Sequence, residues 1–243
     1  MSQPPAIATV NLVKAFGDHY ALRGISLQVD RREVTAIFGP NGAGKTTFLR
    51  ILSGLSRPTS GEILFEGKPL SDDSETIRQH LGVIGHQSFL YGELTAEENL
   101  FFYGRLYGLT GLSKRVEQAL DEVGLGERAN DRVSTFSRGM QQRLAIARAM
   151  LHHPRLLFLD EPFSGLDQHA AAMLAGWLQR LRSEEQTILL VTHDLEQGLA
   201  LSDRLVIFAR GRVVYDQRTA SMSADEWRRA YFERVSAEPG DAP

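Results

Sequence analysis

The residues best suited to chemistry form one glycine-rich run, Gly39-Pro40-Asn41-Gly42-Ala43-Gly44-Lys45-Thr46-Thr47. It follows an apolar stretch typical of a strand (34–38) and precedes apolar residues at helical spacing (48–52). That context is typical of the phosphate-binding motif G-x-x-x-x-G-K-[ST]. Glycines let successive backbone N–H groups point at phosphate oxygens, and the helix N-terminus adds positive charge. Lys45 is expected to reach the β- and γ-phosphates, and Thr46 to offer its hydroxyl to Mg²⁺. The run therefore predicts binding of a nucleoside triphosphate.

A second element ends in two adjacent carboxylates, Asp160 and Glu161, after the apolar residues 156–159. Four apolar residues predict a strand buried on both faces, and open α/β sheets bind ligands at the carboxyl ends of such strands. In a protein with a phosphate-binding loop, Asp160 is expected to hold Mg²⁺ through water. Glu161 can then orient the attacking water or accept its proton.

The apolar patterns predict an α/β fold whose strands and helices alternate around these two elements. Strands are expected at 7–12, 25–29, 34–38, 61–65, 81–84, 156–159 and 187–191, with a hairpin at 205–208 and 212–215. Helices are expected from Thr95, where Glu98 completes a capping box, and at 113–123, 139–151, 170–182 and 225–235, with a frayed C-terminal tail. The helix at 170–182 joins two buried strands, which predicts a βαβ crossover.

Composition limits the classes of protein that the chain can belong to. With 243 residues, 42% hydrophobic and 23% charged, the chain fits one globular domain with an inserted lobe. The net charge of −3 argues against nucleic-acid binding. The chain has no cysteine, shows no signal peptide and has no apolar run of membrane-spanning length. Any membrane role is therefore expected to depend on a partner.

Together these elements resemble the nucleotide-binding domain of ABC (ATP-binding cassette) ATPases, over residues 7–216. Further family motifs follow in the family's order. They are an aromatic residue for adenine (Phe16), the glutamine motif (Gln87), the signature motif beginning Phe136-Ser137-Arg138-Gly139-Met140, the D-loop at 164–167, and the switch histidine (His193).

The resemblance implies a P-loop NTPase core, a RecA-like mixed sheet with helices, together with an antiparallel β subdomain and an inserted helical signature subdomain. The whole chain, 1–243, is then one ABC ATPase domain, with its core at 1–88 and 153–216, the helical subdomain at about 89–152 and a short tail at 217–243. It also implies catalytic roles for Glu161, His193 and Gln87. ATP contacts are implied for Phe16, Gly39, Asn41, Gly42, Ala43, Gly44, Lys45, Thr46, Thr47, Ser137, Gly139 and Asp167, and Mg²⁺ contacts for Thr46, Gln87 and Asp160.

In the family, the signature residues bind ATP held by a second subunit, so the resemblance implies a dimer, most simply a homodimer. It also implies an integral membrane permease, received near Phe89, Leu90, Tyr91 and Leu94, and a cytoplasmic location at the membrane face. The run 94–109 and the Ser-Arg-Gly-Met signature are similar to export-type ATPases, including ABC-2-type exporters and the haem-exporter ATPase of cytochrome c maturation.

The chain departs from the family pattern at three positions. Arg138 and Met140 replace a glycine and a glutamine of the common signature, and Arg138 is expected to face solvent. Arg32 stands where the family usually has glycine, so the family pattern does not fix the geometry of that turn.

His152 and His153 are expected to lie on a helix surface, about 100° apart and therefore poorly placed to chelate a metal.

Other function classes fit less well. Soluble ABC ATPases that act on DNA carry a long coiled coil between Lys45 and Asp160, but no sustained heptads occur there. Those that act on ribosomes usually carry two cassettes in one chain. A GTPase would need an Asn-Lys-x-Asp motif, which is missing. The sequence therefore favours a transporter ATPase.

Overall fold

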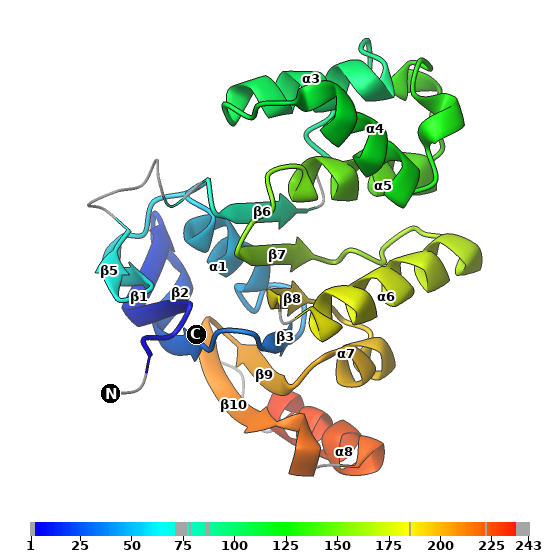
Figure 1. Ribbon diagram of the computed structural model, residues 1–243. Helices are drawn as coiled ribbons and strands as arrows, with labels where there is room; N and C mark the ends of the chain where they lie inside the picture. The colour runs from blue at the N-terminus through cyan, green and yellow to red at the C-terminus, as the bar shows by residue number, and fades with distance from the viewer. Residues whose placement is uncertain are drawn as a thin grey trace.

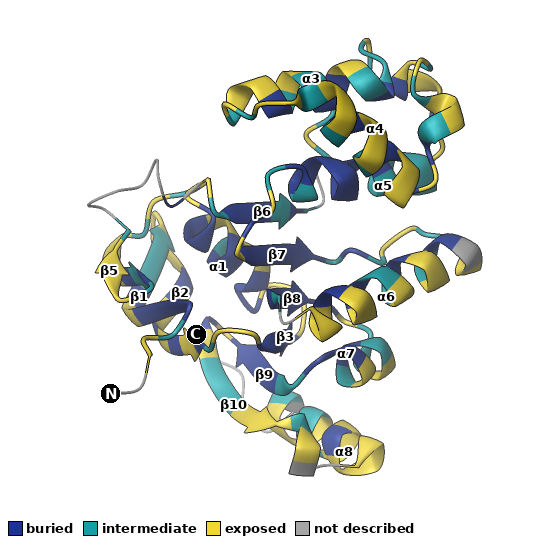
Figure 2. Cartoon of the chain, viewed as in Figure 1, coloured by how far each residue is buried: buried dark blue, intermediate teal, exposed yellow. Residues whose placement is uncertain are grey.

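The computed structural model describes residues 3–70, 77, 79–85, 88–184, 186–221 and 223–236. Figure 1 shows a central sheet with a smaller sheet at one side and a group of helices above it. The buried residues concentrate in the central strands and on the inner faces of the surrounding helices (Figure 2).

The central sheet has six strands in the order β10-β9-β3-β8-β7-β6. Their bounds are β3 Val34–Phe38, β6 Leu81–Ile84, β7 Leu156–Asp160, β8 Thr187–Val191, β9 Arg204–Ala209 and β10 Arg212–Arg218. All pairs are parallel except the hairpin of β9 and β10. Every residue of β3, β7 and β8 is buried, which explains their continuous apolar sequences. The carboxyl ends of these three strands meet at one edge of the sheet, which is where the predicted chemistry lies.

Helices cover the central sheet and connect its strands. They are α1 Lys45–Leu52 after β3, α6 Gln168–Ser183 between β7 and β8, and α7 Leu195–Leu201 after β8. The expected βαβ crossover through α6 is confirmed.

The smaller sheet is antiparallel and has the order β2-β1-β4-β5, with bounds β1 Ile7–Phe16, β2 His19–Val29, β4 Ser60–Phe65 and β5 Lys68–Pro69. Its first two strands are longer than the predicted 7–12 and 25–29. Register shifts interrupt their pairing, and Asn11 lies within β1 at φ 46°. Such bulges break the alternation of apolar and polar residues, so the sequence pattern did not reveal the outer halves of these strands.

The helical subdomain consists of α3 Ala96–Leu106, α4 Leu112–Glu122 and α5 Arg138–Met150 (Figure 1). The predicted capping box at Thr95 and Glu98 is confirmed, because each side chain accepts a hydrogen bond from the other residue's backbone N–H. Leu100, Val116 and Leu144 from the three helices belong to one apolar cluster that continues into β7 and α6. Packing therefore joins the subdomain to the nucleotide-binding core.

The histidines after α5 differ from the prediction. Because α5 ends at Met150, His152 and His153 lie in a turn and not on a helix. His153 is exposed, but the His152 ring stacks on Tyr107 with 4.0 Å between centroids, and its Nε2 lies 3.1 Å from the carbonyl oxygen of Leu81. Burial lowers the pKa of His152 to about 4, so its imidazole is neutral at physiological pH. His152 is therefore a packing residue.

Arg32 adopts φ 60°, the left-handed conformation that glycine reaches without strain. For a residue with a Cβ this conformation costs about 1–2 kcal/mol. The chain therefore keeps the turn geometry expected for glycine while carrying an arginine there.

The last described helix, α8 Ala224–Ser236, packs on the core. Trp227 is only 1% exposed, and its ring meets Phe38 of β3 edge-on at 5.0 Å between centroids. Because β3 leads directly into the phosphate-binding loop, this contact supports the strand that positions the loop. Within the described part of the chain, no helix is both long and apolar enough to cross a bilayer.

We expect Trp227→Ala to lower the free energy of unfolding by about 3–5 kcal/mol, because it removes a large, fully buried ring. Phe232→Ala, on the same helix but 60% exposed, should change it by less than about 0.5 kcal/mol. Urea unfolding of the two variants checks this. Equal effects would show that α8 is not anchored through Trp227.

Candidate functional site

The phosphate-binding loop lies between β3 and α1, and its shape depends on glycines. Gly39, Gly42 and Gly44 have φ values of 150°, 80° and 97°. A Cβ on Gly39 would lie 2.1 Å from the carbonyl oxygen of Phe208, and one on Gly44 would lie 2.4 Å from that of Ala21. Neither position has room for a side chain, so only glycine lets the loop adopt this shape.

Lys45 is the charged group of the loop and is only 8% exposed. Its Nζ donates hydrogen bonds to the carbonyl oxygens of Gly39, at 2.6 Å, and Pro40, at 3.0 Å. Burial lowers the pKa of Lys45, while the nearby Glu161 and Asp160 carboxylates oppose that shift. The ammonium group is therefore held inside the loop, where it can meet phosphate oxygens.

Thr46 and Asp160 form the candidate Mg²⁺ site. The Thr46 hydroxyl donates to Oδ1 of Asp160 at 3.2 Å, which joins the start of α1 to the end of β7. Both are hard oxygen donors, which Mg²⁺ prefers, and Mg²⁺ usually takes few protein ligands beside water and phosphate. Among the described residues no cluster of three His, Asp or Glu side chains could hold a metal. The donor set therefore fits Mg²⁺ bound together with a triphosphate.

Glu161 and His193 meet beside this pair. The Nδ1 atom of His193 lies 2.7 Å from Oε2 of Glu161, and the two residues follow the neighbouring strands β7 and β8. Glu161 adopts φ 51°, a strained conformation for a residue with a Cβ. Such strain is typical of functional sites, where the surroundings hold a side chain in one position. The structure thus directs the Glu161 carboxylate towards His193.

Other predicted ATP contacts lie around the loop. Asn41 is exposed, Ala43 is buried and Thr47 is half-buried in α1. Phe16, at the end of β1, is 56% exposed, and Nζ of Lys14 lies 4.9 Å from its ring centroid. An exposed aromatic face beside a cation provides a platform on which a purine can stack.

The signature residues form a separate surface at the start of α5. Ser137 caps this helix, accepting a hydrogen bond from the N–H of Met140 at 3.3 Å, and Arg138 is exposed as expected. Asp167 caps α6 through a 2.8 Å hydrogen bond from the N–H of Ala170. Within the described residues, no hydrogen bond joins Ser137 or Gly139 to the phosphate-binding loop. Within the described part of one chain, the two groups are therefore not hydrogen-bonded to each other.

Gln87 lies outside the described residues. Gly85 and Phe89, which lie on either side of it in the sequence, line a cavity of about 480 Å³ that Thr46 and Asp160 also line. Sequence motifs did not assign Phe89 to the nucleotide site, and they did not single out Lys14. For Lys14 the available signal was its spacing, since residues two apart on a strand point to the same side.

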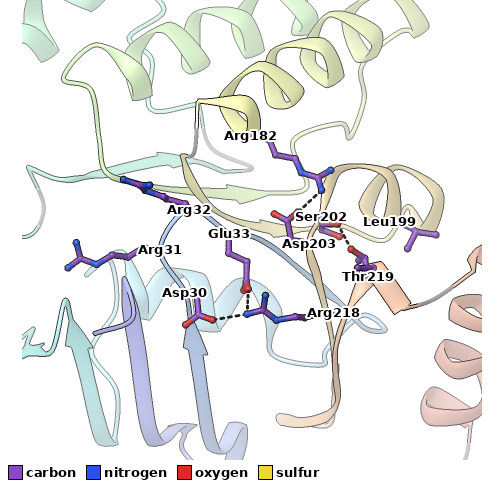
Figure 3. Close-up of a pocket in the computed structure, with 11 residues that line it drawn as sticks. Asp30, Arg31, Arg32, Glu33, Arg182, Leu199, Ser202, Asp203, Arg218 and Thr219 are labelled. Atoms are coloured by element: carbon purple, nitrogen blue, oxygen red, sulfur yellow. Dashed lines mark hydrogen bonds and ion pairs between the residues drawn. The ribbon is translucent and has the colours of Figure 1, made fainter. Parts of the chain in front are cut away.

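A second hollow lies at the opposite end of the central sheet (Figure 3). Arg182 pairs there with Asp203, and Arg218 with Asp30 and Glu33 at 3.2 and 3.4 Å. These ion pairs join the starts of β3 and β9 to α6 and β10. They hold together elements of the core, far from the chemical groups described above.

Comparison with known proteins agrees with this geometry. Residues 22–164 match the family model described as ABC transporter. The chain belongs to the ABC transporter family. It is 38% identical to the ABC transporter ATP-binding protein NatA of Bacillus subtilis (strain 168) over 209 residues, covering 85% of each chain. It is 37% identical to the Nod factor export ATP-binding protein I of Rhizobium sp. (strain N33), covering 85% of this chain and 69% of the relative.

A solved dimeric ATP-binding cassette, in a post-hydrolysis state with ADP and Pi, superposes with a TM-score of 0.80 at 29% identity. The match covers 89% of this chain and 100% of that one. The predicted P-loop NTPase fold, with its antiparallel and helical subdomains, is confirmed. This ABC protein is an ATPase subunit that binds and hydrolyses ATP.

Lys45→Ala should weaken ATP binding about 10–100-fold, because it removes charge-assisted hydrogen bonds to phosphate. Lys114→Ala, at an exposed position of α4 in the helical subdomain, serves as the control and should leave affinity unchanged. Titration calorimetry with Mg²⁺ and ATP measures the affinity of both variants. Full affinity in Lys45→Ala would mean that the loop does not hold the phosphates.

Proposed function

We propose that this ABC ATPase powers a membrane exporter from the cytoplasmic face, using Mg²⁺ and ATP. The observation that carries the proposal is the arrangement at the edge of the sheet. Lys45, Thr46, Asp160, Glu161 and His193 converge on one site, while the signature residues form a second surface. The family and the similarity to a Nod factor export protein support the transport role and its outward direction.

In the proposed reaction, each side chain has a separate task. Lys45 neutralises the terminal phosphates, and Thr46 and Asp160 hold Mg²⁺. Glu161 receives the proton of the attacking water or orients that water, and His193 holds the Glu161 carboxylate at 2.7 Å. Mg²⁺ would withdraw charge from the phosphate oxygens when bound. We place Gln87 beside the metal and the attacking water because of its sequence motif alone.

The second half of the site is assigned to another copy of the chain. Ser137 and the backbone N–H groups near Gly139 lie at the exposed start of α5, where a helix N-terminus favours an anion. Among the described residues no hydrogen bond joins them to the loop of their own chain, and we assign them to an ATP held by a second chain. The dimeric cassette with the same fold supports this arrangement. Asp167 is assigned to the same interface.

A permease is assigned to an exposed aromatic surface, defined by Phe89, Tyr91 and Phe102, which are 36%, 48% and 41% exposed. The Tyr91 and Phe102 rings meet edge-on at 5.0 Å between centroids. Exposed apolar groups of this kind are typical of protein interfaces. Phe89 also lines the cavity beside Thr46 and Asp160, so this surface reaches the nucleotide site.

Glu161→Gln should bind ATP normally and lower kcat by about 10²–10⁴-fold, because the carboxylate acts on water and not on the nucleotide. The stalled protein should accumulate as a dimer with ATP, which sedimentation velocity detects. Wild-type turnover in this variant would remove Glu161 from the reaction.

Ser137→Arg should leave ATP affinity within about twofold of wild type and abolish hydrolysis, because the signature surface contacts only the partner's nucleotide. Parallel measurements of ATP binding and phosphate release test this. The shared-site model fails if binding by the single chain is lost together with hydrolysis.

A further inference from the structure

Arg148 is a buried cation that the family motifs do not use. It lies near the end of α5 and is only 6% exposed. Among the described residues, the groups that oppose the effect of burial on its pKa are the tyrosines Tyr103 and Tyr107, and none of them is a carboxylate. A buried charge without a carboxylate is costly unless it makes other strong contacts. The contacts of Arg148 therefore indicate its role.

The first contact is with the outermost strand of the central sheet. Nη2 of Arg148 donates to the carbonyl oxygen of Val83 in β6 at 2.6 Å. His152, four residues later, lies 3.1 Å from the carbonyl oxygen of Leu81 in the same strand. Leu81 and Val83 are two residues apart on the strand and face the same side, so Arg148 and His152 both bind β6 from that side. Because β6 pairs with β7, this contact lies one strand away from Asp160.

The second contact is with Phe89, beyond the end of β6. The Arg148 guanidinium lies 5.4 Å from the ring centroid of Phe89 and 5.1 Å from that of Tyr103, both within cation–π range. The Tyr103 hydroxyl donates to the carbonyl oxygen of Phe89. Phe89 has φ 54°, a strained conformation that requires such support.

Phe89 connects two surfaces of the molecule. It belongs to the exposed aromatic surface, and it lines the cavity that Thr46 and Asp160 share. A shift of Phe89 would therefore change the wall of the nucleotide site. Arg148 contacts this residue and β6 at the same time, through one guanidinium group.

We propose that Arg148 is a positioning residue for ATP hydrolysis, which fixes Phe89 against β6 and so links the exposed aromatic surface to the Mg²⁺ and water side of the site. The inference rests on the proposed function, since it assigns Arg148 a part in that reaction. Arg148 does not touch the nucleotide. Its loss should therefore affect turnover and not ATP binding.

The test measures kcat and KM for ATP with the purified full chain. Arg148→Lys keeps the charge but loses the planar group, and should lower kcat about tenfold with KM within about twofold of wild type. Tyr103→Phe keeps the ring and removes only the hydroxyl bonded to Phe89, and should lower kcat about threefold. This second variant tests the proposal even if substitutions at Arg148 prevent folding.

Arg204→Met is the control for a purely structural effect. Arg204 is also a largely buried arginine, bonded to the carbonyl oxygen of Gln28 at 2.9 Å and to Asp216, at the start of β9 away from the nucleotide site. It should lower the melting temperature and leave kcat per folded protein unchanged. ATP hydrolysis by the wild-type protein tests the reaction of the proposed function separately from the role of Arg148. The role of Arg148 alone would be overturned if kcat were unchanged in both test variants. It would also be overturned if their activity fell only in proportion to the loss of folded protein, as expected for Arg204→Met.

Discussion

The nucleotide site depends on how closely the backbone of the phosphate-binding loop approaches its neighbours. The positions of Gly39 and Gly44 leave no room for a Cβ against the carbonyl oxygens of Phe208 and Ala21. These carbonyls belong to β9 of the central sheet and β2 of the smaller sheet. Both sheets therefore limit the space around the loop, and β2, which pairs with β1 outside the central sheet, places the Ala21 carbonyl oxygen against Gly44.

The same edge of the sheet combines rigid support with local strain. The fully buried strands β3, β7 and β8 fix where the loop, the carboxylates and His193 begin. Beside this support the backbone adopts strained, positive φ values, at Glu161 and again at Phe89. Each strained residue is held by a side chain from another element, His193 for Glu161 and Tyr103 for Phe89. Strain of this kind persists only where several contacts determine one conformation.

Local sequence patterns predicted the parts of this structure that depend on few residues. The glycine-rich loop, the buried strand before Asp160 and the capping box at Thr95 each have a short pattern with a direct physical cause. The outer halves of β1 and β2 were missed because bulges disturb the alternation on which strand prediction relies.

Contacts between distant segments could not be predicted in this way. Examples are the stacking of His152 on Tyr107, the packing of Trp227 on Phe38 and the contact of Arg148 with Val83 and Phe89. Each depends on how the helices meet the sheet, and no single stretch of sequence contains that information.

The central claim is that each ATP site needs one loop and one signature surface from different chains. Mixing two inactive variants, Lys45→Ala and Ser137→Arg, tests it most directly. Random pairing makes about half of the dimers mixed, and each mixed dimer has one complete site, so hydrolysis should return to at most about a quarter of the wild-type rate. If the mixture stays as inactive as its components although mixed dimers form, the two halves act within one chain and the account is wrong.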